Sequence, residues 1–425
     1  MLFRLAWRLF TEISPRLAIK AGWLWVYKGM GAVRAYRRRL LRGEVFPPFL
    51  FLALTNACNL RCHGCWIESR GEKHSLDSED VDRVIAAGKR QGSYFYTLLG
   101  GEPMIYEGLW ELIARHPDCY FQIITNGMFH DEGNVERIRK LGNVTPLVSI
   151  DGMAASNDDR RGPDVFEAAV AGMRRLKQRK ILFGVATTMT SRNMEEVLSD
   201  EYVRFIIEQG AMYLWFYVFR PVGADPSPHY CVGREQMIEL RRRLLELRRR
   251  HPIMLIDTYW NARGEAVCPA ALGMGYHIGP RGSIEACPPL SFACETIHAE
   301  AEKGSGTFCR NGPDGASHKR CLTPFPPNDN DNLFDTINQS EFLRGFSKFV
   351  NERTRGCVIL EHPQELVEFL KASGVKDYSG RDALAELAAG TPRGSHDMKG
   401  EEIPEDYWVY RFLKNQLFFG MSGYG

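Results

Sequence analysis

Three cysteines stand close together in the first part of the chain, and their spacing suits a metal centre. Cys58, Cys62 and Cys65 are separated by three and two residues, and they follow an apolar run, residues 49–55, that predicts a β-strand. Three thiolates on such a loop can bind three irons of a cubane cluster and leave the fourth iron free. Two other interpretations stay open on spacing alone. One is a zinc site, for which His63 is a poorly placed fourth ligand, and the other is reduced thiols without metal.

The elements that would position this loop form a regular alternation. Apolar, β-branched or aromatic runs predict six strands, at residues 49–55, 94–100, 121–125, 147–151, 183–188 and 214–219. Segments with helical periodicity lie between them, and one begins after the cap-like pair Asp77 and Ser78. Strands that alternate with helices indicate a parallel α/β sheet. Six such units favour an open, partial (β/α)6 barrel of the TIM type, whose chemistry would lie at the carboxyl ends of the strands.

Small, polar or charged residues follow the strands at those ends. They are Gly100, Gly101, Glu102 and Pro103 after the second strand, Asn126 after the third, Ser149 and Asp151 at the fourth, Thr188 and Asn193 after the fifth, and Arg220 after the sixth. Any one of these groups could be an ordinary turn, because Gly-Gly, Asn-Gly and Asp-Gly are common turn dipeptides. Their convergence on one edge of the sheet predicts a binding site there.

The cysteine triad and the Gly-Gly-Glu-Pro motif together resemble the radical S-adenosylmethionine (SAM) superfamily over residues 49–255. The resemblance implies that Cys58, Cys62 and Cys65 ligate a [4Fe–4S] cluster whose open iron binds the amino and carboxylate groups of SAM. An electron from a flavodoxin- or ferredoxin-type donor would cleave SAM to methionine and a 5′-deoxyadenosyl radical. That radical would remove a hydrogen atom from a substrate.

The same resemblance assigns the residues at the strand ends to the cofactor. Gly100, Gly101 and Glu102 of the Gly-Gly-Glu-Pro motif would meet the methionine ammonium through backbone carbonyls and a carboxylate. Ribose or carboxylate contacts would fall to Asn126, Ser149, Asp151, Thr188 and Asn193. The family usually has an aromatic residue before the third cysteine, where this chain has Gly64. We expect Trp66, just after Cys65, either to supply that packing or to shield the loop.

A second group of cysteines follows residue 260. Cys268 and Cys287 enclose a predicted hairpin, residues 278–285, with Gly282 at its turn. This pattern resembles the opening of the SPASM or twitch extension of radical SAM enzymes, which implies at least one auxiliary [4Fe–4S] cluster. Its expected ligands are Cys268, Cys287 and Cys357, with the fourth among Cys294, Cys309 and Cys321. Cys119 and Cys231 are interpreted as thiols without a metal.

The flanks of the chain have a different composition. We expect four segments: a basic helical extension at 1–48, the barrel at 49–255, the auxiliary-cluster domain at 256–360 and a helical tail at 361–425. Residues 1–48 carry ten Arg and Lys against two Glu, interleaved with Trp, Tyr and Phe. Two interpretations are open. The helices could lie at a membrane interface, or they could pack across the barrel with a solvated arginine face.

Overall composition argues against several classes of protein, although an enzyme that modifies a nucleic acid stays open. The 425 residues are 44% hydrophobic and carry a net charge of +2, which argues against a dedicated nucleic-acid binder. No apolar run is long enough to span a bilayer, and no secretory signal is evident. Eleven cysteines in a chain of this length indicate metal binding in a reducing cytoplasm rather than a disulfide scaffold.

The sequence therefore predicts a radical SAM enzyme that makes an oxidative C–C or C–S bond in an unidentified substrate. The Trp- and Arg-rich extension favours a lipid or membrane-proximal substrate, with the enzyme in the cytoplasm, peripheral to the inner face of the membrane. Maturation of a ribosomally made peptide or protein is the alternative. A non-catalytic scaffold braced by metal is the alternative of another class.

Overall fold

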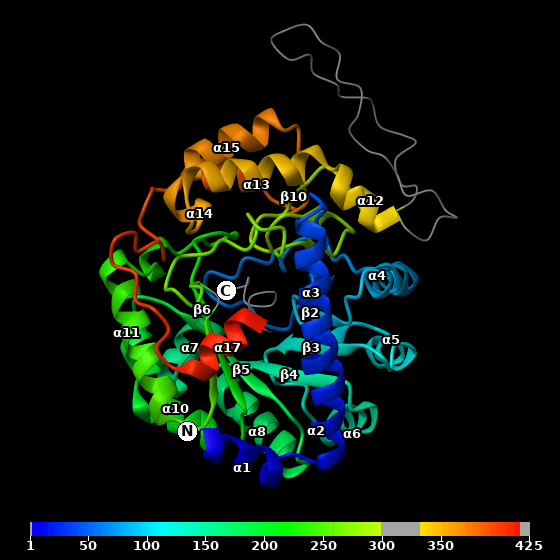
Figure 1. The fold of residues 1–425 in the computed structure, drawn as a ribbon, viewed down its shortest axis with the longest axis vertical. Coiled ribbons are helices and arrows are strands. Elements are labelled where there is room, and N and C mark those ends of the chain that lie inside the picture. The colour runs from blue at the N-terminus through cyan, green and yellow to red at the C-terminus, as the bar shows by residue number, and fades with distance from the viewer. Residues whose placement is uncertain (1, 258, 299–331, 417–425) are drawn as a thin grey trace, which may run out of the picture.

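The computed structural model describes residues 2–257, 259–298 and 332–416 (Figure 1). Its centre is a nine-stranded sheet in the order β7-β6-β5-β4-β3-β2-β1-β8-β9. The first seven strands run parallel and are β1 (Phe49–Thr55), β2 (Phe95–Gly100), β3 (Tyr120–Thr125), β4 (Val144–Ser149), β5 (Gly184–Met189), β6 (Tyr213–Val218) and β7 (Met254–Ile256). The six expected strands and the partial-barrel fold are confirmed. The sequence did not predict β7, because its three residues are too few to show a pattern.

Helices cover the outside of this sheet, and most of them lie between one strand and the next along the chain. They are α4 (Ser78–Arg90), α5 (Leu109–Arg115), α6 (Glu132–Leu141), α7 (Ala154–Arg161), α8 (Val165–Gln178), α9 (Met194–Val197), α10 (Asp200–Glu208) and α11 (Arg234–Arg250). The cap of α4 is as expected, since Asp77 Oδ1 accepts from the Glu79 N–H at 2.7 Å. Short 3-10 turns occur at Pro103–Ile105 and Pro228–Tyr230.

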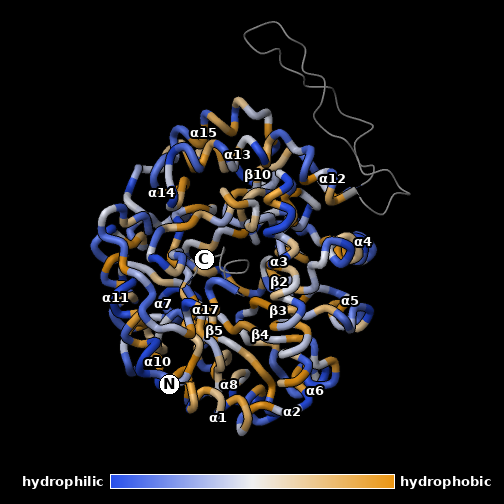
Figure 2. The backbone as a smooth tube through the Cα atoms, in the orientation of Figure 1, coloured by the Kyte–Doolittle hydropathy of each residue, from blue (hydrophilic) through white to orange (hydrophobic). Residues whose placement is uncertain are grey.

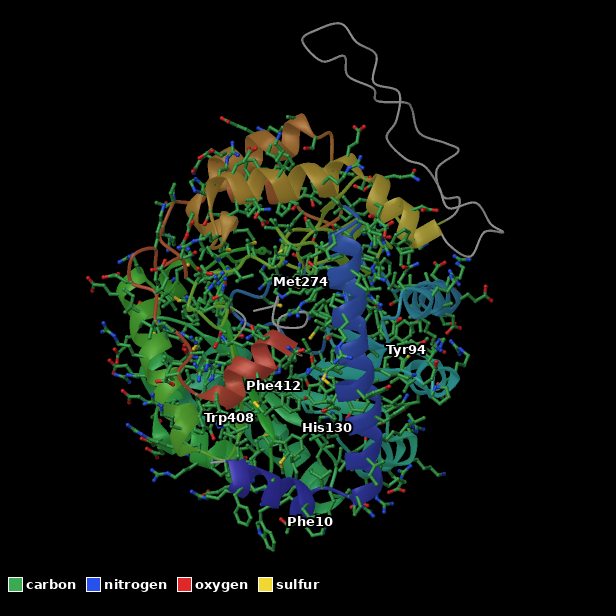
Figure 3. All side chains as sticks on the ribbon, viewed as in Figure 1. Phe10, Tyr94, His130, Met274, Trp408 and Phe412 are labelled. Atoms are coloured by element: carbon green, nitrogen blue, oxygen red, sulfur yellow. The ribbon has the colours of Figure 1, made fainter. Side chains whose placement is uncertain are left out.

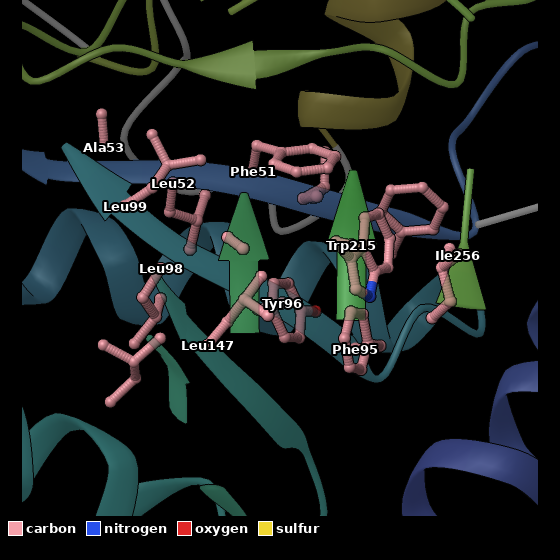
Figure 4. Packing of buried hydrophobic residues seen from close by; sticks show 14 of the residues in the cluster. Phe51, Leu52, Ala53, Phe95, Tyr96, Leu98, Leu99, Leu147, Trp215 and Ile256 are labelled. Carbon is pink, nitrogen blue, oxygen red and sulfur yellow. The ribbon is translucent and has the colours of Figure 1, made fainter. Parts of the chain in front are cut away.

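The core lies between the strands and these helices. Leu52, Leu98 and Leu147 are fully buried, and Figure 4 shows them among aromatic and aliphatic side chains of neighbouring strands. In Figure 2 the strands are mainly hydrophobic, whereas hydrophilic and hydrophobic residues alternate along the outer helices. This is the pattern of a parallel sheet that is covered by amphipathic helices.

The N-terminal extension crosses the amino ends of the strands. It consists of α1 (Leu2–Glu12), α2 (Pro15–Ala21), the π-helical turn η1 (Gly22–Tyr27) and α3 (Lys28–Leu40). Trp25 of η1 stacks on Phe95 and Tyr120, at the first residues of β2 and β3, with ring centroids 5.9 and 6.0 Å apart. The extension therefore closes the amino end of the barrel, as the packing interpretation expected.

Several cations of this extension are bonded to the barrel rather than solvated. Lys20 Nζ donates to Leu141 O at 2.7 Å, Lys28 Nζ to Asp118 O at 2.9 Å, and Arg39 Nη1 to Gln91 O at 2.8 Å. These carbonyls lie at or just after the carboxyl ends of α6, α5 and α4, where unpaired carbonyls carry partial negative charge. The expectation of a simply solvated arginine face is therefore wrong for this inner side.

The C-terminal part of the chain continues the same sheet. Strand β8 (His277–Ile278) runs parallel to β1, and β9 (Ile284–Glu285) pairs antiparallel with β8. This confirms the expected hairpin, with Gly282 at a φ of +78°. The other elements are β10 (Phe292–Ala293), β11 (Lys376–Asp377), α12 (Asn332–Gln339), α13 (Glu341–Arg353), α14 (Val358–Glu361), α15 (Pro363–Ala372), α16 (Ala383–Ala388) and α17 (Trp408–Gln416).

Helix α17 packs along β7 and is fixed there by buried charges. Lys414 Nζ lies 3.0 Å from Asp257 Oδ1, and Arg248 contacts both Asp257 and Glu405 at 2.5 Å. The N–H of Leu255, in β7, donates to Tyr410 Oη at 2.8 Å. Within the described residues, every helix is too short or too polar to cross a bilayer.

Candidate active site

A cavity of about 300 Å³ lies at the carboxyl ends of the parallel strands. The barrel contributes Cys62, Cys65, Gly100, Ser149, Thr188 and Arg220 to its wall, among others. The C-terminal part contributes Cys268, Cys287, Cys357 and His396. The two groups of cysteines that the sequence singled out therefore face one common space.

The loop that carries the cysteine triad is folded against α7. The His63 N–H donates to Arg160 O at 2.8 Å, and the Cys65 N–H donates to Cys62 O at 3.3 Å. All three triad thiols are free, and together with Gly101 they also line a small pocket beside the cavity. Burial raises the pKa of Cys58 to about 11. Because iron binds the thiolate, loading this loop must release protons.

The described residues form no site that could hold a single metal ion. Among the described residues, no three His, Cys, Asp or Glu side chains converge closely enough to hold a single metal ion. In a cubane cluster each thiolate binds a different iron, so its ligands stand apart around the cluster.

Phe219, which follows β6, lies against Gly64, the residue before the third cysteine. A Cβ built on Gly64 would lie 2.4 Å from Phe219 Cε2, and Gly64 has a φ of +63°. Phe219 follows β6 and lines the cavity beside Cys65. The glycine thus leaves room for a ring supplied from β6. Trp66 also lines the cavity, and it packs edge-on against His277 with ring centroids 5.6 Å apart.

Asp151 forms ion pairs with two arginines that the sequence analysis did not identify. Its buried carboxylate accepts from Arg160 Nη1 at 2.6 Å, from Arg161 Nε at 2.7 Å and from the Thr188 N–H at 2.7 Å. Burial would raise the pKa of Asp151, but the charges of Arg161 and Arg160 outweigh it and hold that pKa below its ordinary value. Both arginines line the cavity. The available signal was the Arg-Arg-Gly sequence at the end of α7.

These two arginines leave an excess of positive charge beside the triad. The charges of Asp151, Cys62 and Cys65 raise the pKa of Arg161 against the opposing effect of burial. A buried cation beside thiols favours their ionised form. The same cation suits a ligand carboxylate, because guanidinium binds carboxylates with two N–H groups.

Glu102 lies behind the cavity wall rather than on it. Its carboxylate accepts from Thr125 Oγ1 at 2.8 Å, from the Asn126 N–H at 2.8 Å and from the Met104 N–H at 3.0 Å. Burial raises the pKa of Glu102 to about 7. In this structure the carboxylate ties the end of β2 to the end of β3, and Pro103 begins the turn that follows.

Gly100 and Gly101 are required by the close approach of the triad loop. A Cβ at either position would lie 2.1 Å from a backbone oxygen, that of Thr55 or of Ala57. Asn126 Nδ2 donates to Asn59 Oδ1 at 2.8 Å, which places it beside the same loop. Both glycines and Asn126 therefore lie next to the cysteine triad, as expected.

The remaining predicted contacts differ in their position. Ser149 and Thr188 line the cavity. Asn193 does not; its Nδ2 donates to Asp151 O at 2.8 Å and to Thr188 O at 2.9 Å. It thus holds the loops after β4 and β5 together.

On the opposite wall lie three of the expected auxiliary ligands. Cys268, Cys287 and Cys357 line the cavity, and Arg220 Nε donates to Cys357 Sγ at 3.0 Å. Burial raises the pKa of Cys268 to about 12. Cys294 is not part of this wall, and its Sγ lies 3.7 Å from Ser373 O. Cys309 and Cys321 lie outside the described residues.

Arg220 and His396 complete this side of the cavity. The guanidinium of Arg220 also donates to Val218 O at 2.8 Å and lies over the ring of Tyr259. Burial lowers the pKa of His396 to about 3, so its imidazole is neutral. Among the described residues its Nδ1 has no hydrogen-bond partner, while Nε2 lies 3.3 Å from Val267 O.

Residues 52–200 match the family model described as the radical SAM superfamily. The chain carries a radical SAM domain. Members of this superfamily use a [4Fe–4S] cluster and SAM, and the SPASM-type members carry auxiliary clusters. The matched residues include the cysteine triad, Gly-Gly-Glu-Pro and the ends of β2 to β5.

Named relatives of this chain share only part of their length with it. The sporulation killing factor maturation protein SkfB of Bacillus subtilis is 33% identical over 150 residues, or 34% of this chain and 37% of SkfB. An AdoMet-dependent heme synthase of Oleidesulfovibrio alaskensis is 30% identical over 176 residues, or 39% and 45%. The chain thus matches less than half of either protein.

The fold has a counterpart among solved structures. Streptococcus suis SuiB bound to its precursor peptide SuiA has a TM-score of 0.50, with 16% identity over 60% of this chain and 63% of SuiB. At this identity the likeness concerns the fold alone. It supports the partial α/β barrel fold.

Proposed function

We propose that this chain is a radical SAM enzyme that oxidatively modifies a substrate held between its two groups of cysteines. The observation that carries the proposal is the shared cavity, lined by Cys62 and Cys65 on one side and by Cys268, Cys287 and Cys357 on the other. When bound, a [4Fe–4S] cluster and SAM supply one-electron cleavage of SAM and a carbon radical that removes a hydrogen atom from the substrate.

The barrel side would bind and orient these groups. Cys58, Cys62 and Cys65 would hold the cluster, and the buried charge of Arg161 beside them offsets their negative charge. The excess cation at Arg160 and Arg161 would bind the carboxylate of SAM. The backbone carbonyls of Gly100 and Gly101 would accept from its ammonium group.

The opposite wall would hold an auxiliary cluster through Cys268, Cys287 and Cys357. The Arg220 N–H bonded to Cys357 Sγ places a buried positive charge on this site. A cluster beside the substrate supplies a one-electron acceptor, which favours an oxidative product such as a new C–C or C–S bond. We further propose a flavodoxin- or ferredoxin-type electron donor and a reducing cytoplasm.

A peptide is the better supported substrate class. SkfB is named for the maturation of a killing factor, and SuiB was solved with a precursor peptide. The lipid substrate that the sequence favoured is the second candidate. Its main support was the aromatic extension, which packs at the amino ends of the strands, whereas the cavity lies at their carboxyl ends.

The test is anaerobic reconstitution of the full chain, followed by dithionite, SAM and an assay for 5′-deoxyadenosine. The wild-type chain should form 5′-deoxyadenosine, and the variant with Cys58, Cys62 and Cys65 all changed to Ala should not. Cys119→Ala is the matched control, because Cys119 is buried and does not line the cavity. An iron-loaded wild-type chain that never cleaves SAM would instead favour the metal-braced scaffold.

A further inference from the structure

Exposed large hydrophobic side chains gather in two segments of the described chain. Of the fourteen such residues, ten lie in residues 2–41 and two in α17. The most exposed aromatic ones are Phe3, Trp7, Phe10, Trp23, Tyr27, Trp408 and Phe412, which we call the aromatic face. The other two, Ile105 and Met128, lie beyond the carboxyl ends of β2 and β3. Isolated exposed apolar residues are ordinary, but a large cluster usually marks an interaction surface.

The two segments are neighbours in the fold. Arg8 of α1 donates to Pro252 O at 2.9 Å, and Tyr410 of α17 accepts from the Leu255 N–H at 2.8 Å, so both helices attach around the start of β7. Arg37 of α3 donates to Asn415 O of α17. In Figures 1 and 3, α3 and α17 pass in front of the sheet, with Trp408 and Phe412 on α17 and Phe10 on α1. Helices α1, α3 and α17 are thus neighbours in the fold.

The aromatic face is also positively charged. Residues 1–48 hold ten Arg and Lys against two Glu, although the whole chain has a net charge of only +2. Lys28 and Arg39 donate hydrogen bonds to backbone carbonyls of the barrel, whereas Arg4, Arg34 and Arg38 are exposed. Trp and Tyr rings beside exposed arginines suit the headgroup region of a bilayer, where the rings are half-solvated and the cations meet lipid phosphates.

We propose that the aromatic face docks on an anionic lipid bilayer. Charge complementarity decides between the possible occupants. A second copy of this chain would bring cations against cations, which is unfavourable in protein interfaces, whereas anionic lipid attracts each of them. Docking takes place through the amino ends of the strands. It therefore leaves the cavity at the far end of the barrel, where substrate enters from the aqueous side.

This proposal does not depend on the enzyme's chemistry, so it is tested on the reconstituted full chain without SAM. The chain is sedimented with vesicles of phosphatidylcholine alone and with vesicles that contain phosphatidylglycerol in equal part. We expect sedimentation with the anionic vesicles, weakened by salt because exposed charges are screened. Absence of binding to the anionic vesicles, or equal binding to both kinds, would overturn the proposal.

Paired variants locate the contact. Trp7→Ala with Phe10→Ala, and separately Trp408→Ala with Phe412→Ala, should each weaken binding about tenfold or more, from the apolar area that each pair no longer buries. Ile105→Ala with Met128→Ala is the matched control and should bind like the wild-type chain. Unchanged iron content and circular dichroism would show that the variants fold.

A measurement on the unmodified chain guards against misfolded variants. Brominated phosphatidylglycerol should quench its tryptophan fluorescence, because Trp7, Trp23 and Trp408 would lie at headgroup depth. If light scattering instead gave a dimer in the wild-type chain that both aromatic pairs of substitutions abolished, the face would be an interface between copies, and the proposal would be wrong.

Discussion

The two ends of the barrel use their cations in different ways. At the amino end, Lys20, Lys28 and Arg39 donate to carbonyls at the ends of barrel helices. At the carboxyl end, Arg161 and Arg220 are buried beside cysteine thiols and line a cavity. The first arrangement stabilises the fold, and the second concentrates charge and reactive groups where a ligand can bind. The division agrees with the general rule that parallel barrels place their chemistry at the carboxyl ends of the strands.

The largest effect should come from the buried ion cluster at the carboxyl end. Asp151→Ala leaves Arg160 and Arg161 without their buried carboxylate, and loss of one partner of such a pair costs about 3 to 5 kcal/mol. Urea unfolding of the iron-free chain measures it. The exposed pair Arg42 and Glu44 is the control, since Glu44→Ala should cost at most about 1 kcal/mol. If Asp151→Ala and Glu44→Ala lowered the free energy of unfolding equally, the expected contrast between the buried and the exposed ion pair would be wrong.

Glu102 should make stability depend on pH. Burial raises its pKa from the ordinary 4.5 to about 7, so the folded chain keeps a proton that the unfolded chain releases. Its stabilising contribution is full below the unfolded value and is lost as pH rises through about 7, by on the order of 3 kcal/mol. Unfolding in urea at several pH values checks this.

Glu102→Gln provides the comparison for that profile. Its amide nitrogen would replace one carboxyl oxygen and so face one N–H donor, that of Met104 or that of Asn126, and the lost hydrogen bond should make the variant less stable where Glu102 is protonated. Its stability should also vary less with pH across this window. A wild-type profile that is flat in the same range would show that Glu102 ionises as an ordinary carboxyl.

The contact between Gly64 and Phe219 should appear as a coupling energy. Gly64→Ala sets a Cβ against the Phe219 ring and strains a residue with φ of +63°, at a cost of about 1 to 3 kcal/mol. Phe219→Ala removes the clash but not the strain. In a double-mutant cycle on urea unfolding, the double variant should be more stable than the sum of the single changes implies. If the two changes in unfolding free energy were strictly additive, the Phe219 ring would not contact the loop at position 64.

Arg220 should affect an auxiliary cluster without affecting SAM cleavage. Its N–H bond to Cys357 Sγ and its buried charge favour the reduced, more negative cluster. Arg220→Met should therefore lower the reduction potential of that cluster in an EPR-monitored titration of the chain without the triad cysteines. Arg220→Lys, which keeps the charge, should shift it less. An unchanged reduction potential in Arg220→Met would show that Arg220 does not stabilise the reduced cluster.

The smallest effect should come from the amino end. Lys28→Met removes one donor to Asp118 O, after the end of α5, which is worth about 0.3 to 1 kcal/mol for a cation at a helix carboxyl end. Unfolding in urea at low and high salt measures it, and the difference should shrink with salt. A loss as large as that of Asp151→Ala would mean that this end is as sensitive as the other.

The sequence predicted those parts of the molecule that have a local pattern. Short residue spacings identified the cysteine triad and Gly-Gly-Glu-Pro, and the alternation of apolar runs with helical segments predicted six strands. Gly282 predicted the turn of the hairpin. Contacts between distant residues could not be seen in this way. The ring of Phe219 against Gly64 and the carbonyls that accept from Lys20 and Lys28 lie about a hundred or more residues away in the chain.

The direction in which a side chain points could not be predicted from the sequence either. The position of Asp151 at the end of β4 is as expected, but only the structure shows that its carboxylate faces Arg160 and Arg161. In the same way, Glu102 follows β2 as expected, yet it turns toward Thr125 and Asn126. Spacing gives the residue and the strand end, whereas packing decides which way the group points.

The central claim is that the two groups of cysteines hold two separate iron–sulfur clusters beside one cavity. Iron and acid-labile sulfide are counted after anaerobic reconstitution of the wild-type chain and of two triple variants, one without Cys58, Cys62 and Cys65 and one without Cys268, Cys287 and Cys357. We predict about eight irons per wild-type chain and about four in each variant, with distinct EPR signals. Zinc in place of iron, or the loss of all iron from either variant, would contradict the account.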